Sequence, residues 1–241
     1  MIVLLIKKSG FYILILSIIN SIVLTGIIIF LIICNHKPID STEIFKNNID
    51  SVVEVKATTL DLGESYGSGV IYSSDGYLIT NAHVVSYTRL GEIRTFDTYE
   101  IRFAKDKEYK EAQFIKMDNE LDLAILKISE DGKYNSISFS KDTYTYGDSV
   151  YAIGNTSNYG IGISKGIISV PEVNIIYNDI SRKVIQADID IAGGNSGGAL
   201  LDKKGNLIGI TTFRTKDLSN NVNYGFAYSI PVRIVKEYIG V

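Results

Sequence analysis

Residues 192–200 read AGGNSGGAL, with four glycines closely spaced around Ser196. Glycine accepts positive φ and lets other backbone approach closely, so this stretch predicts a tight turn with exposed N–H groups. A serine hydroxyl attacks a carbonyl when a base takes its proton and fixed donors stabilise the oxyanion. The N–H groups of Gly194 and Ser196 are the natural donors here. A glycine-rich hairpin with an incidental serine is the alternative.

The base for this serine would be a histidine, and the chain has two, His36 and His83. His36 stands directly after a long apolar run, which leaves His83 as the candidate for a globular active site. His83 follows a turn signal at residues 74–76 and an alternating apolar strand pattern. The pattern indicates His83 as the general base, and the alternative is a structural or surface histidine.

An acid that orients the histidine would complete the set, and Asp122 is the candidate. It lies within the apolar segment LDLAIL, residues 121–126. Burying a carboxylate among apolar residues is costly without a partner, so Asp122 should meet a buried cation or a strong donor. The alternative is an aspartate on an edge strand that faces water.

Three segments occur in the order TNAHVV (80–85), LDLAIL (121–126) and GGNSGGAL (193–200). With them, the chain resembles the HtrA/Deg family of trypsin-fold serine proteases. The resemblance implies an all-β fold of two six-stranded antiparallel β-barrels with a short C-terminal helix, in which the first barrel supplies His83 and Asp122 and the second supplies Ser196. The order of the three candidate residues along the chain, His83, Asp122 and Ser196, also differs from the order of the catalytic residues in subtilisin-type enzymes and α/β-hydrolases. Shorter segments that fit the family are GSGV (67–70), AIGN (152–155), GIIS (166–169), GNLIGI (205–210) and GFA (225–227).

The resemblance also implies two substrate-binding residues. Thr212 falls where relatives place a residue that supports the acid and starts the strand along which a substrate pairs. Asp190 stands six residues before Ser196, an offset that in trypsin-like enzymes reaches the floor of the specificity pocket. A carboxylate there would select lysine or arginine. Alternatively, Asp190 faces solvent or pairs with Arg182 or Lys183, and the preference is for small apolar side chains.

Residues 11–34 are predicted to form a transmembrane helix. The run from 11 to 33 carries no charge, and at this length a helix reaches roughly 34 Å, enough for a hydrocarbon core of about 30 Å. A cleaved signal peptide, with a shorter apolar region, is the alternative. Lys7 and Lys8 favour a cytoplasmic N-terminus and an extracytoplasmic protease domain.

The remaining chain is predicted to be a polar linker followed by a protease domain, residues 49–241. Short strand patterns separated by glycine and aspartate turns fill most of the domain, and Pro231 opens a helical pattern. The chain ends soon after this helix, so the PDZ domain of many relatives is not expected. The expected boundaries are a cytoplasmic segment 1–10, the span 11–34, the linker 35–48, the barrels 49–139 and 140–229, and the helix 230–241.

Composition argues against several other functions. The formal net charge of −3 and the mixed signs among the charges of residues 89–111 give no argument for nucleic acid. Two histidines and one cysteine leave little for a zinc site, and Cys34 has no second cysteine for a disulfide. No P-loop, dinucleotide fingerprint or calcium loop occurs, so neither a metal nor a cofactor is expected.

Together these features predict a membrane-anchored, cofactor-independent serine endopeptidase that cleaves extracytoplasmic proteins or peptides. The lipid bilayer, through residues 11–34, is its other expected partner, and the sequence does not indicate an oligomeric state. The non-enzymatic alternative is a membrane-tethered protein of the same fold that only binds extended peptides by adding a strand to its sheet edge.

Overall fold

The computed structural model describes most of the chain. The described residues are 2–35, 40–60, 63–141, 143–156, 159–177, 180–213 and 226–241. They fall into two compact units, Met1–Pro38 and Ile39–Val241. The first unit contains helix α1 (Ile2–Asn35). The described residues include no helix that is long and apolar enough to cross a membrane, so the span expected over residues 11–34 is not confirmed.

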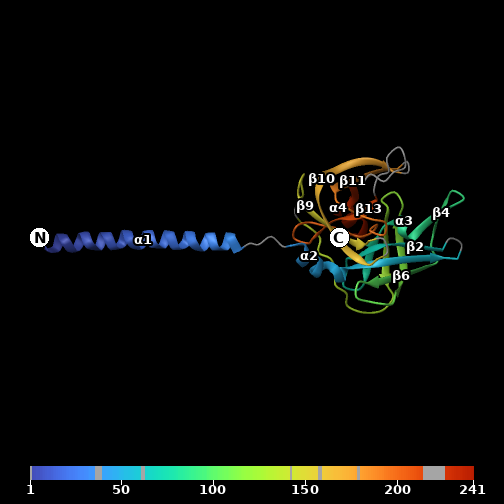
Figure 1. Ribbon diagram of the computed structural model, residues 1–241, viewed down its shortest axis with the longest axis horizontal. Helices are drawn as coiled ribbons and strands as arrows, with labels where there is room; N and C mark the ends of the chain where they lie inside the picture. The colour runs from blue at the N-terminus through green and yellow to red at the C-terminus, as the bar shows by residue number, and fades with distance from the viewer. Residues whose placement is uncertain are drawn as a thin grey trace. The chain divides into compact units, whose positions relative to one another are not determined.

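The second unit is built from antiparallel strands that close into two six-stranded barrels, in the orders β1-β2-β3-β8-β7-β6 and β10-β11-β14-β13-β12-β9. Figure 1 shows β9, β10 and β11 on one side of this unit and β2, β4 and β6 on the other. The expected all-β class is confirmed. The first barrel contains β1 (Val52–Thr59), β2 (Gly63–Ile71), β3 (Tyr77–Thr80), β6 (Thr98–Phe103), β7 (Lys110–Asp118) and β8 (Leu123–Ile128). The second contains β9 (Ser149–Asn155), β10 (Ile161–Tyr177), β11 (Ile180–Asp188), β12 (Ala199–Leu201), β13 (Leu207–Phe213) and β14 (Phe226–Pro231).

Shorter elements connect and flank the strands. The 3-10 helix η1 (Ile49–Ser51) precedes β1. Helix α3 (Ala82–Val85) follows β3 and leads into a separate hairpin of β4 (Ser86–Arg89) and β5 (Glu92–Thr95). Helix α4 (Val232–Ile239) follows β14 and ends at Gly240, whose φ of 79° is that of a left-handed cap. The expected C-terminal helix is therefore present.

The alternation of residues along β1 explains how both faces of a strand become buried. Val53, Val55 and Ala57 fill the interior of the first barrel. Val52 belongs instead to a cluster that also contains residues of the second barrel. Because successive side chains of a strand point to opposite faces, β1 supplies the core of its own barrel and part of the contact with the other.

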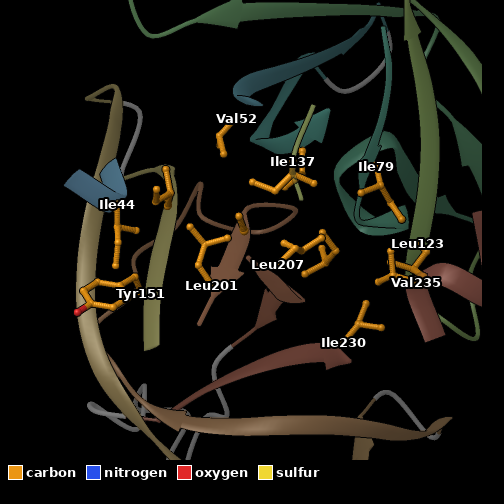
Figure 2. Packing of buried hydrophobic residues seen from close by; sticks show 14 residues of the cluster. Ile44, Val52, Ile79, Leu123, Ile137, Tyr151, Leu201, Leu207, Ile230 and Val235 are labelled. Atoms are coloured by element: carbon orange, nitrogen blue, oxygen red, sulfur yellow. The ribbon is translucent and has the colours of Figure 1, made fainter. Parts of the chain in front are cut away.

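The two barrels share one apolar cluster (Figure 2). Val52, Ile79 and Leu123 of the first barrel pack there with Leu207 and Ile230 of the second, and each of these side chains is at most 2% exposed. Full burial of one such side chain stabilises a protein by about 1.5–3 kcal/mol. The shared cluster therefore holds the barrels together and fixes the residues at their boundary.

Residues 41–48, expected to be part of the linker, form helix α2 (Ser41–Asn48). Asp40 caps this helix by accepting a hydrogen bond of 2.9 Å from the N–H of Glu43. Ile44 is only 1% exposed and packs in the cluster that the barrels share. Helix α2 is thus part of the folded domain, which begins before the expected boundary at residue 49.

This packing predicts that Ile44→Ala lowers the free energy of unfolding by about 2–5 kcal/mol, because it removes a buried side chain from a close-packed cluster. Urea unfolding of the purified chain, followed by circular dichroism, measures the change. The matched control is Lys46→Ala on the exposed side of α2, with an expected change within about 0.5 kcal/mol. Equal, small effects of the two substitutions would contradict a core role for α2.

Candidate active site

His83 lies in the short helix α3, directly after β3. Its neighbours Ala82, Val84 and Val85 are buried and anchor the helix in the first barrel. The His83 side chain itself is 47% exposed. The buried neighbours thus hold the helix in place, and the helix presents the imidazole of His83 at the surface.

Asp122 lies in the turn between β7 and β8, one residue before β8 begins. The sequence placed it inside an apolar strand, and this placement was wrong by one residue. Asp122 has a positive φ of 57°, which a continuous strand does not allow. The turn aims its carboxylate, which is 7% exposed, at His83.

The Asp122 carboxylate accepts three kinds of hydrogen bond. Nδ1 of His83 lies 2.9 Å from Oδ2 and 3.0 Å from Oδ1. The backbone N–H of His83 donates to Oδ1 at 3.1 Å. The hydroxyl of Thr212, from β13 of the other barrel, donates to Oδ2 at 2.6 Å. Asp122 therefore has the strong donors that a buried carboxylate requires.

These contacts decide the ionisation of Asp122. Burial raises its pKa, but the hydrogen bonds and charge of His83 and the hydrogen bond from Thr212 outweigh burial and hold the pKa below its usual value. An ionised carboxylate can only accept, so Nδ1 of His83 must donate the proton between them. In neutral His83, Nε2 is then left as the acceptor that a general base needs.

Ser196 lies in the glycine-rich turn that precedes β12. Gly194 and Gly197 have positive φ values of 91° and 86°. A Cβ on Gly197 would lie 2.1 Å from the carbonyl oxygen of Ser68, so only glycine fits where this turn meets β2. The predicted tight turn is present, and it packs directly on the first barrel.

The hydroxyl of Ser196 donates to the backbone carbonyl of Thr212 at 2.7 Å. No hydrogen bond joins Ser196 to His83 in the part of the chain that the structure describes. The structure thus brings Asp122 and His83 into direct contact, while Ser196 is connected to them through Thr212. Attack on a substrate requires the hydroxyl to turn from Thr212 to His83.

Ser68 holds the backbone of the nucleophile turn from the opposite barrel. Its hydroxyl donates to the carbonyl of Gly194 at 2.7 Å, and its N–H donates to the carbonyl of Ser196 at 2.8 Å. The N–H groups of Gly194 and Ser196 have no protein acceptor among the described residues. Both donors are thus available to a ligand oxygen, as an oxyanion hole requires. The segment GSGV contains Ser68, but no pattern in the sequence indicates that this residue supports the turn.

The two expected substrate-binding residues differ in their surroundings. Thr212 is 1% exposed and contacts both Asp122 and Ser196. Asp190 is exposed, in the connection between β11 and β12.

A metal centre finds no support in the described ranges. They contain no group of three or more histidine, cysteine, aspartate or glutamate side chains that could hold a metal ion.

The chain is similar to several known proteins. The trypsin-like peptidase domain family matches residues 67–210, which include His83, Asp122 and Ser196. The chain is 36% identical over 174 residues to the serine endoprotease DegS of Haemophilus influenzae, covering 72% of this chain and 48% of that protein. It is 34% identical over 179 residues to a probable periplasmic serine endoprotease, DegP-like, of Bartonella henselae, covering 73% of this chain and 33% of that protein.

The chain is also similar to a solved structure. The HtrA-type protease AlgW with tripeptide matches with a TM-score of 0.71 and 31% identity, covering 83% of this chain and 62% of that chain. The chain spans less than half the length of the two curated relatives. These similarities confirm the expected resemblance to the HtrA/Deg proteases, and the chain belongs to the family of trypsin-like peptidases.

Proposed function

We propose that this chain is a serine endopeptidase that hydrolyses peptide bonds through Ser196, His83 and Asp122. The observation that carries the proposal is the environment of His83. A buried, ionised carboxylate 2.9 Å away holds Nδ1, while the imidazole is 47% exposed toward an incoming substrate. Relatives named as serine endoproteases, which are 34% and 36% identical over the aligned 73% and 72% of this chain, support the same activity.

In this mechanism Nε2 of His83 takes the proton from Oγ of Ser196 as Oγ bonds to the carbonyl carbon of the substrate. The N–H groups of Gly194 and Ser196 stabilise the oxyanion. His83 then donates the proton to the leaving amine, which leaves an acyl-enzyme, and water repeats the sequence to release the acid. Asp122 stabilises the imidazolium and does not take the proton itself.

A catalytically silent peptide-binding protein is the second candidate. The observation that favours it is the hydrogen bond from Ser196 to the carbonyl of Thr212, which turns the hydroxyl away from His83. Such a protein would bind extended peptides along a free strand edge without cleaving them. Covalent labelling of the serine separates the two functions.

We also propose that residues 11–34 anchor the protease domain to a membrane, with the domain on the extracytoplasmic side. The uncharged run from 11 to 33 supports this, as do large apolar side chains of α1 that are exposed, such as Leu16 at 63% and Ile22 at 66%. Exposed apolar surface of this kind marks a site of interaction with a membrane or another protein.

For the nucleophile, we expect Ser196→Ala to abolish cleavage of casein, because loss of the triad serine lowers the kcat of subtilisin about 10⁶-fold. The parent should react covalently with a fluorophosphonate probe, and the variant should not. The matched control is Ser136→Ala, since Ser136 is exposed in the connection between the barrels. Cleavage by the Ser196 variant within tenfold of the parent would rule out the proposed nucleophile.

For the base, we expect cleavage to accelerate between about pH 5 and pH 8, because His83 must be neutral to accept a proton. Asp122 does not account for this rise. Its pKa is lowered, so the carboxylate is ionised throughout that range. Chelators should leave the profile unchanged. A rate that does not vary over this range would argue against a histidine base.

For the anchor, we expect the full chain to sediment with membranes and to remain there after an alkaline carbonate wash, which releases peripheral proteins. The control is a chain that begins at residue 39, which should stay in the supernatant. Release of the full chain by carbonate would remove membrane anchoring from the proposal and leave the protease assignment intact.

A further inference from the structure

The turn that carries Asp122 has a strained backbone. It spans residues 119–122, between β7 and β8, and ends at Asp122 with φ of 57°. A left-handed conformation is unfavourable for a residue other than glycine, and it persists only where the surroundings determine it. The contacts that hold this turn therefore decide where the carboxylate lies.

Some of these contacts come from the first barrel itself. The Asp118 carboxylate accepts the N–H of Leu121 at 2.9 Å. The side-chain amide of Asn81 donates to the carbonyl of Asp122 at 2.9 Å. Both bonds act on the second half of the turn.

The first half of the turn is held from the second barrel by Arg182, on β11. Its Nη2 donates to the carbonyl of Asn119 at 2.8 Å, and its Nε donates to the carbonyl of Glu120 at 3.0 Å. The guanidinium is a rigid planar fork, so its two bonds fix two successive peptide groups at once. Bonds from a charged donor are also stronger than those between neutral groups.

We propose that Arg182 is a positioning residue for the catalytic acid, because it clamps the turn 119–122 so that Asp122 reaches His83. The assignment rests on the proposed function, in which Asp122 orients the base. Loss of the clamp displaces the carboxylate and leaves the nucleophile turn and the substrate strand in place. It should therefore slow the chemical step more than it weakens substrate binding.

The kinetic test compares three variants of the full chain. Arg182→Ala should lower kcat on the order of 10- to 100-fold with little change in KM, as displacement of a catalytic group by about 1 Å does. Arg182→Lys should fall between this variant and the parent, because an ammonium group lacks the planar fork that reaches both carbonyls. The control is Lys183→Ala. Lys183 is the next residue on the same strand, and its ammonium group pairs with Glu172 at 3.1 Å.

A second readout does not depend on proteolysis. The proton on Nδ1 of His83, shared with a carboxylate, gives a far-downfield proton NMR signal, which Asp122→Asn assigns by removing it. We expect the signal to persist in Lys183→Ala and to be shifted or lost in Arg182→Ala. This NMR outcome would support the clamp even if the parent cleaved no substrate. A parent that cleaves no substrate would instead count against the proposed function.

Three outcomes would overturn the proposal. One is a folded Arg182→Ala variant with parental kcat and an unchanged downfield signal. If Arg182→Ala does not fold, the second outcome is a folded Arg182→Lys variant that matches the parent in both readouts. Equal losses in Arg182→Ala and Lys183→Ala would also overturn it, since they would show a general effect of charge on β11.

Discussion

The hydrogen bond from the Thr212 hydroxyl to the Asp122 carboxylate, 2.6 Å long, joins the two barrels at the centre of the site. The two residues are 90 positions apart in the chain, so only the packing of one barrel on the other brings them together. Without this donor, burial would raise the pKa of Asp122 with less to oppose it. The ionisation of the acid therefore depends on how the barrels dock.

Each barrel depends on the other for the position of its site residues. Ser68 of the first barrel holds the carbonyl groups of Gly194 and Ser196 in the second, while Thr212 and Arg182 of the second barrel hold the acid and its turn in the first. Each barrel thus positions groups that the other supplies. The apolar cluster between them, which includes Leu123 next to Asp122, makes this arrangement rigid because close-packed interiors resist small displacements.

The contact between His83 and Asp122 could be expected from the sequence, because the domain holds one histidine and an apolar segment with one carboxylate. The glycines around Ser196 likewise indicated a tight turn. The φ of 57° at Asp122 could not be expected, since it is set by contacts with residues distant in sequence. The same holds for Ile44 and Ser68. Their roles arise only when the barrels pack, and neither hydrophobic periodicity nor charge patterning in their own segments indicates these roles.

Thr212 uses two of its polar groups in the site, because its hydroxyl donates to Asp122 and its carbonyl accepts from Ser196. For Ser196 to reach His83, the second bond must break. A hydrogen bond of this kind contributes a net of about 0.5–1.5 kcal/mol, whereas a single oxyanion donor contributes about 2.7–4 kcal/mol to the transition state. The cost of freeing the hydroxyl is thus smaller than the stabilisation that one N–H of the turn can supply. The resting hydrogen bond on Thr212 is therefore compatible with an active peptidase.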